Sequence, residues 1–595
     1  MRSFSKWLLI PLLAAVTVLP TLHGQVTGDN LLVTAARDND AQAVRALIAK
    51  RSNVNAPARD GSTALLWAVY NSNLEMTRAL IAAGAAVNTP NKFGITPLLQ
   101  ASRTGDAPII DVLIKAGAER GRGQNETETP LMAASRSGRL DAVRLLLEAG
   151  AGVNDTDSSE QQTALMWAAA EGHSDVITAL LKAGAEPDRK ARVTTLAERK
   201  HADHPTGGFT ALMFAVRNGH EAAARALIAG GADPSITNGD GVTATIVAIV
   251  NDRFDLAATL IELGANANDG SLYWAVDMHD ATTDMRAHDG SRLRANHENT
   301  RTALDLVKLL LERGADPNKP FQGQLHSTTL CCGPEVNSSA FYRAASAADV
   351  EALKLMLAHG AQVEWTPPEI KKEGRGGRGG RGNPNANRTP IMVAMNGGRG
   401  APFAAGPGFE RLGPPPFREA SNRQPADAVK VLLDAGANPN VATPDGSTAL
   451  HQAVQARQVP IIRSLVAAGA RLDAVNKENL TPLLLAEKPD PPPPPGNNTD
   501  SRAWRPARNS REEVIAALRE LMKLGPNDPA PVPPPKPVDP KAKATDKGAG
   551  AGDENAGDGD ADASDDGKKD EQKPAADEQK PAAKPQGGDN AQGAK

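Results

Sequence analysis

The dipeptide Gly-Ala recurs along the chain at a nearly constant interval, and this repetition constrains the fold more than any other feature. Its first four copies begin 33, 33 and 34 residues apart, and later copies are separated by 33 residues or by longer intervals. A second marker, Thr-Ala-Leu or Thr-Pro-Leu, keeps the same register. Such a period is the signature of a repeat array, in which neighbouring repeats cover each other's apolar faces. Gly-Ala begins at Gly84, Gly117, Gly150, Gly184, Gly231, Gly264, Gly314, Gly360, Gly436 and Gly469; the second marker begins at Thr63, Thr96, Thr129, Thr163, Thr210, Thr448 and Thr481, with the variant Thr-Pro-Ile at Thr389.

Each repeat is predicted to fold as two short helices joined by turns. Thr63 is expected to cap a first helix, and in several repeats a Pro follows the Thr, where a missing N–H in the first helical turn costs nothing. A Leu-rich second helix then ends at the Gly of Gly-Ala, because Gly adopts the left-handed conformation without strain. An Asn or Asp three or four residues later, such as Asn88, starts the next turn.

This order of features closely resembles the ankyrin repeat: a turn, Thr-Pro-Leu, a first helix, Gly-Asp or Gly-His, a Leu-rich helix, Gly-Ala and Asn. The resemblance implies an all-α solenoid of about twelve helix-turn-helix repeats, from roughly residue 30 to residue 523. The chain departs from the family where a His usually follows the Leu, because only His451 is present. The hydrogen bond by which this His ties neighbouring turns is therefore expected to be missing elsewhere. The other repeats have Leu66, Leu99, Met132, Met166 and Met213 at this position.

The N-terminus has the pattern of a secretory signal. Arg2 and Lys6 supply positive charge, a short apolar run follows, and the small residue Gly24 lies where cleavage is expected. The apolar run is shorter than the roughly 20 residues that a membrane-spanning helix needs. We therefore expect residues 1–24 to be removed and the protein to be exported, to the periplasm or outside the cell, and not to span a membrane.

The remaining chain is predicted to contain an array and a tail. The array occupies residues 25–270 and 271–525, and long insertions interrupt its second part. Residues 526–595 consist mainly of Pro, Lys, Asp, Gly and Ala, and are expected to be disordered because they have too little apolar surface to bury. Insertions 189–206, 319–337 and 364–386 would extend the turn edge of the array, and insertions 280–301, 397–424 and 487–510 the opposite edge.

Composition agrees with thin helical layers and gives no argument for a charged partner of the whole chain. Aromatic residues make up 3% of the sequence, so Ala and Leu must supply most of the packing, and the net charge is only -4. Cys331 and Cys332 are adjacent, which excludes a disulfide framework. We interpret them as two loop thiols, with a strained vicinal disulfide or pairing with another molecule as alternatives.

The sequence contains no convincing catalytic motif, and we predict a non-enzymatic binding scaffold without a cofactor. The resemblance to ankyrin repeats implies that a protein partner docks on the concave face and the turn tips. Three arginines at matched positions either form a basic ladder on that face or are ordinary solvated charges. The ladder predicts a partner with an acidic surface, and nucleic acid is not expected. The predicted contact residues are Arg59, Tyr70, Lys92, Phe93, Arg103, Arg136 and Arg217.

Aromatic residues recur on the first helices, and two interpretations compete. The stripe is either packed in the core between adjacent first helices, as the family resemblance favours, or a binding surface. Its members are Trp67, Trp167, Phe214 and, by a looser alignment, Trp274.

Two insertions suggest alternative functions. One is rich in His and acidic residues, which are possible ligands of zinc or another divalent ion, and would make the protein a metal-binding protein or a metal-dependent periplasmic enzyme. Another carries a Gly-Arg repeat that resembles an RNA-binding segment and would also suit an envelope polyanion. The first set comprises His279, Asp280, Asp284, His288, Asp289, His297 and Glu298, with His201 and His204 in a third insertion; the second comprises Lys371, Lys372, Arg375, Arg378 and Arg381.

Overall fold

A computed structural model describes the chain in eight stretches. They are residues 28–121, 128–193, 207–280, 299–321, 338–367, 387–395, 423–489 and 509–533, without the side chains of residues 28–30 and 280. The chain separates into two compact units, Met1–Pro534 and Pro535–Lys595, and all described residues belong to the first. The signal segment, the tail beyond residue 533, Cys331 and Cys332 lie outside the described residues, and their predictions stay predictions.

Within the described stretches the chain forms 24 helices and no β-strand. They alternate between an inner and an outer helix, which gives twelve pairs and confirms the predicted all-α repeat fold. The inner helices are α1 (Gly28–Arg37), α3 (Ala64–Tyr70), α5 (Pro97–Thr104), α7 (Pro130–Ser137), α9 (Ala164–Glu171), α11 (Ala211–Asn218), α13 (Ala244–Val250), α15 (Ser271–Asp280), α17 (Ala340–Ser346), α19 (Pro390–Ala394), α21 (Ala449–Gln455) and α23 (Pro482–Glu487). The outer helices are α2 (Ala41–Ala49), α4 (Leu74–Ala82), α6 (Ala107–Lys115), α8 (Leu140–Glu148), α10 (Ser174–Lys182), α12 (Glu221–Ala229), α14 (Phe254–Glu262), α16 (Ala303–Glu312), α18 (Val350–Ala358), α20 (Pro425–Asp434), α22 (Val459–Ala467) and α24 (Arg511–Leu521).

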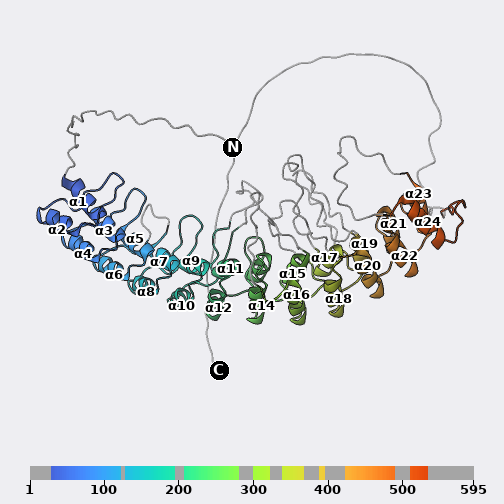
Figure 1. Cartoon of the computed structure of the whole chain (residues 1–595). Coiled ribbons are helices and arrows are strands. Elements are labelled where there is room, and N and C mark those ends of the chain that lie inside the picture. Colours follow the sequence, from blue (N-terminus) through green and yellow to red (C-terminus); the bar gives the residue numbers. More distant parts are fainter. Residues whose placement is uncertain are drawn as a thin grey trace, which may run out of the picture. The chain divides into compact units, whose positions relative to one another are not determined.

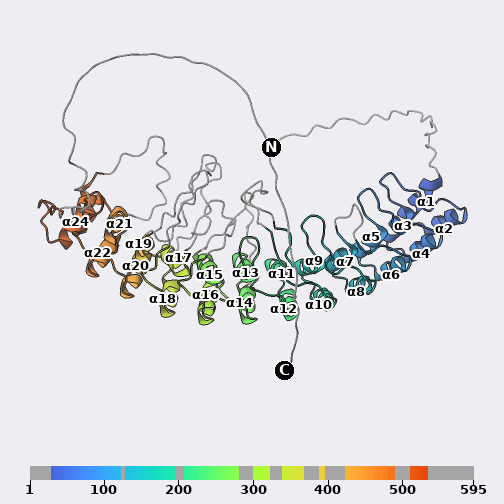
Figure 2. The ribbon, with the colours of Figure 1, turned by 180° about the vertical axis from the view of Figure 1, so that it is seen from behind.

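The helices form two rows that pack against each other. Every inner helix contacts its own outer helix and the inner helices of the neighbouring pairs (Figures 1 and 2). Helices α13 and α15 contact each other across residue 270, where the two predicted parts of the array meet. Each pair is thus covered by its neighbours. We number the pairs as repeats 1 to 12.

The markers have the local roles that the sequence predicted. Thr63 Oγ1 accepts a hydrogen bond from Leu66 N (3.3 Å), and the equivalent Thr caps the inner helix in other repeats. In every outer helix except α2, at least one Leu is completely buried. These residues include Leu80, Leu113, Leu146, Leu180, Leu227, Leu260, Leu310, Leu432 and Leu465.

An Asn that recurs in five of the turns has a second role, which was not predicted from the sequence. Asn88 Nδ2 donates to the carbonyl of Gly117 (3.1 Å), and Asn88 Oδ1 accepts from Glu119 N (2.8 Å), so one side chain joins two repeats. The same pair of bonds recurs at Asn55, Asn154, Asn318 and Asn440. We call these five residues the asparagine ladder. It ties repeats 2 and 4 to the next repeat, and in these two repeats Leu66 and Met132 replace the family's His.

The aromatic stripe of the inner helices belongs mainly to the core. Phe214 and Trp274 are buried, and Trp67 and Trp167 are half-buried and pack against the core. The core interpretation of this stripe is therefore confirmed.

His451 forms the hydrogen bond between neighbouring turns that repeats with Leu or Met at this position cannot form. Its Nδ1 accepts from Thr448 N (3.2 Å) and its Nε2 lies 3.0 Å from the carbonyl of Leu480 in the next repeat, so the neutral ring donates through Nε2. The side chain is completely buried, and this burial lowers the pKa of His451 below its ordinary value.

We predict that His451 makes repeats 11 and 12 sensitive to acid. Its pKa is lower in the folded chain than in the unfolded chain, so its contribution is fully present above the unfolded pKa of about 6.5 and decreases as the pH falls below it. The protection of amides in α21 and α22, measured as the ratio of intrinsic to observed exchange rate, should fall between pH 6.5 and 5 in the unmodified chain. In His451→Leu, which has the side chain of Leu66, this fall in protection should disappear; equal pH dependence of the protection in both proteins would contradict the assignment.

Candidate interaction surface

Four of the predicted contact residues lie exposed on repeats 2 and 3. Phe93 is 74% exposed and Tyr70 is 59% exposed, which is unusual for aromatic side chains, and Arg59 and Lys92 are exposed as well. None of these four makes an ion pair with another described side chain. We call Arg59, Tyr70, Lys92 and Phe93 the N-terminal surface.

The turns and α3 hold this surface in place. Lys92 N donates to the carbonyl of Asp60 (2.9 Å), which fixes the Lys92–Phe93 turn beside the turn of Arg59. On α3 the ring of Tyr70 packs edge-on against Trp67, with 5.5 Å between the ring centres. The half-buried ring of Trp67 thus supports the exposed ring of Tyr70.

The charge of the N-terminal surface is positive but small. Hydrogen bonds from Ser62, and to a lesser extent the charge of Lys92, hold the pKa of Asp60 below its ordinary value, so Asp60 is ionised at neutral pH. The two turns therefore carry two cations, Arg59 and Lys92, and one carboxylate, Asp60. Exposed aromatic rings, rather than a strong positive electrostatic potential, distinguish this surface.

Arg103 and Arg136 of the predicted basic ladder share one acidic partner. Arg103 Nη2 lies 2.8 Å from Glu128 Oε1, and Arg136 Nη1 lies 3.4 Å from Glu128 Oε2. The Glu128 side chain is only 8% exposed, while the two arginines are about one third exposed, at 33% and 38%. The structure therefore brings these arginines together around a buried carboxylate, and the cluster has one net positive charge.

Arg217, the third member of the ladder, packs on aromatic rings. Its guanidinium carbon lies 5.1 Å from the ring centre of Phe214 and 5.6 Å from that of Phe209. Arg136 is held similarly, 5.2 Å from the ring centre of Trp167. Such contacts are favourable for a cation at a partly exposed site.

The three arginines of the basic ladder lie in the last turns of α5, α7 and α11, and they already have partners within the array. Their role in binding stays a prediction. Glu128 and its two ion pairs were not predicted from the sequence. A signal was present, because Glu128 directly precedes the marker residue Thr129, at the junction with the preceding repeat.

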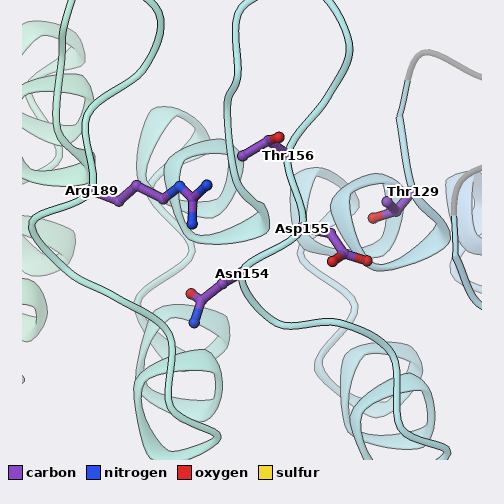
Figure 3. A pocket seen from close by; sticks show the side chains of 5 residues that line it. All are labelled: Thr129, Asn154, Asp155, Thr156 and Arg189. Carbon is purple, nitrogen blue, oxygen red and sulfur yellow. The ribbon is translucent and has the colours of Figure 1, made fainter. Parts of the chain in front are cut away.

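One hollow of about 410 Å³ lies between neighbouring turns (Figure 3). It is lined by Thr129, Asn154, Asp155, Thr156 and Arg189. At least three of these side chains already have partners: Thr129 Oγ1 accepts from Met132 N (3.2 Å), Asn154 belongs to the asparagine ladder, and Arg189 Nη1 lies 3.5 Å from Glu186 Oε2. The hollow is a crevice between repeats, and its residues do not form a catalytic set.

The described residues contain few of the side chains on which the metal-binding and polyanion-binding alternatives depend. Among them no group of three or more His, Cys, Asp or Glu is placed to hold a metal ion, and His279 is bound to Asp349 instead. The side chain of Asp280 and the remaining His and acidic residues of that set lie outside the described residues, as do His201, His204 and the Gly-Arg segment with Lys371, Lys372, Arg375, Arg378 and Arg381. In the part of the chain described, no helix is long and apolar enough to cross a membrane.

Comparison with known families identifies the repeats. A model of three ankyrin repeats matches residues 8–91, 32–122, 80–157, 98–191, 192–271 and 417–489, which together span more than half of the chain. The chain belongs to the ankyrin-repeat family. No curated protein matches this ankyrin-repeat chain. A crystal structure of the human ASB11 ankyrin repeat domain is similar at 25% identity, with a TM-score of 0.32, and covers 36% of this chain and 90% of that domain.

Proposed function

We propose that this ankyrin-repeat protein is a non-enzymatic scaffold that binds a protein partner through its inner-helix face and turn tips. Ankyrin repeats suggest protein binding, and the exposed rings of Phe93 and Tyr70 beside Arg59 and Lys92 support a contact site on repeats 2 and 3. Aromatic residues and Arg dominate the energy of most protein interfaces.

The chemistry of the N-terminal surface defines the partner that we propose. It should offer an apolar pocket or ridge to Phe93 and Tyr70, and carboxylates to Arg59 and Lys92. The cations supply orientation and a faster encounter, whereas burial of the rings supplies most of the affinity. Export to the periplasm or the cell exterior is part of this proposal and rests on the N-terminal sequence pattern alone.

We predict that the Phe93→Ser/Tyr70→Ser double variant loses partner capture. Each buried aromatic anchor contributes about 2 kcal/mol or more to an interface, so the affinity should fall by roughly 100-fold or more. Immobilised variant and unmodified chain would be compared for the proteins that they retain from an envelope extract, identified by mass spectrometry.

A matched control tests whether the loss is local. Leu263→Ser also removes an exposed apolar side chain, but from the end of outer helix α14. This control should retain the same proteins as the unmodified chain. If the aromatic double variant retains them too, the N-terminal surface is not the contact site.

A further inference from the structure

A buried carboxylate links three successive repeats at the edge opposite the turn tips. Asp349 lies directly before α18 of repeat 9, and its side chain is 2% exposed. Its Oδ2 lies 2.5 Å from Nδ1 of His279, in the last turn of α15 in repeat 8. The same oxygen lies 3.1 Å from Nη2 of Arg423, which precedes α20 in repeat 10.

Arg423 also reaches across the intervening repeat. Its Nη2 donates to the backbone carbonyl of His279 (2.9 Å), although the two residues are 144 positions apart in the sequence. A repeat of a solenoid ordinarily contacts only its nearest neighbours, so its stability is a sum of local and nearest-neighbour terms. A direct contact between repeats 8 and 10 departs from that rule.

The same carboxylate has an ordinary structural role that must be separated from this link. Asp349 Oδ1 accepts from Ala352 N (3.1 Å) and so caps α18. Burial by itself raises the pKa of Asp349, but the hydrogen bond from His279 and the charge of Arg423 outweigh it and hold this pKa below its ordinary value. The carboxylate is therefore ionised at neutral pH, with both of its oxygens bound.

Other charged groups lie near His279 in the sequence and on the adjoining helix α17. Asp277, two residues before His279 on α15, binds Arg343 of α17, with 2.7 Å between Oδ1 and Nε. This second ion pair also joins repeats 8 and 9. The two pairs hold the end of α15, where the insertion predicted at residues 280–301 begins, and Arg423 lies near the end of the insertion predicted at residues 397–424.

We propose that His279, Asp349 and Arg423 form a clamp that makes repeats 8 to 10 one cooperative block. The clamp holds the points at which two insertions leave or rejoin the array. Loss of the Asp349 charge releases repeat 8 and repeat 10 together, because both are bound to the same oxygen.

The test compares two substitutions that both keep a helix cap. Asp349→Asn retains the capping oxygen but removes the charge that His279 and Arg423 share. Asp106→Asn is the control, because Asp106 caps α6 with nearly the same backbone angles, φ -79 and ψ 85 against φ -83 and ψ 88 for Asp349. Asp106 makes no ion pair among the described side chains.

Amide hydrogen exchange of the full chain gives the readout. Asp349→Asn should raise exchange about tenfold or more in both α15 and α20, whereas Asp106→Asn should leave the helices adjacent to α6 within about twofold. A rise confined to the first turn of α18 would show a cap alone and overturn the clamp. Arg423→Met, which leaves the cap intact, should also raise exchange in α15; no change there would overturn the clamp as well, even if Asp349→Asn failed to fold.

Discussion

The Arg103→Glu/Arg136→Glu double variant is expected to destabilise repeats 3 and 4 by about 3–5 kcal/mol, because it leaves the buried Glu128 carboxylate without a partner. The new carboxylates also repel Glu128 at short range. In an array, this loss should appear as local unfolding of α5 to α8. It would be measured by urea denaturation followed by circular dichroism, together with amide exchange of these helices.

Removal of the buried charge should rescue that variant. Glu128→Gln in the charge-reversed background eliminates the repulsion, and most of the lost stability should return. Arg217→Glu serves as the control, because Arg217 packs on rings and has no carboxylate partner among the described residues. Its cost should be below about 1 kcal/mol. A double variant as stable as the unmodified chain would show that the ion pairs around Glu128 are unimportant.

This cluster changes how the basic ladder can be tested. Charge reversal at Arg103 and Arg136 would abolish partner capture by unfolding the inner helices, whether or not these arginines touch the partner. Replacement of Phe93 and Tyr70 avoids the problem, because both side chains are exposed and make no described ion pair. Capture experiments are therefore best begun on the N-terminal surface.

The sequence was sufficient for the fold because its markers act locally. Thr63 caps the helix that begins at the next residue, by accepting a hydrogen bond from Leu66 N, and the Gly of Gly-Ala ends the second helix of a repeat. Each marker therefore determines the structure of the residues around it. Repetition of these markers then implied stacking. The asparagine ladder follows the same period, since Asn88 bonds 29 and 31 residues ahead, and it was visible as a recurring Asn whose partner was not assigned.

The candidate sites were harder to predict because their contacts cross repeats. Arg103 and Glu128 are 25 residues apart, less than one period, so aligning the repeats by their markers does not pair them. The link from Arg423 to His279 also crosses insertions of irregular length, where the repeat register is lost. Exposure of Phe93 and Tyr70 was predictable from their positions, but the existing partners of the arginines were not.

Gly172→Ala is expected to destabilise the array by about 3 kcal/mol, from two causes that can be measured separately. Gly172 ends α9 with φ +81, a left-handed conformation that is strained for Ala. A Cβ atom there would also lie 2.6 Å from Nδ1 of His220, in the next repeat. The His220 ring would have to move, and its Nε2 would lose its contact with the carbonyl of Ala170 (3.1 Å).

Gly184→Ala isolates the first cause, because Gly184 has φ +90 and a Cβ atom there would meet nothing within 4 Å. Only backbone strain remains, and this variant should lose about 1–2 kcal/mol. The unfolded chain loses the same backbone freedom in both variants, so that effect cancels in the comparison. Urea denaturation of these two variants and of Gly172→Ala/His220→Ala would separate the two contributions. The added His220→Ala substitution removes the steric overlap at the cost of one hydrogen bond. The free energy of unfolding of this double variant should therefore lie within about 1 kcal/mol of that of Gly184→Ala. If Gly172→Ala and Gly184→Ala were equally stable, the His220 ring would not be held against Gly172, and the contact between repeats 5 and 6 would have to be looser than the packing of α9 on α11 indicates.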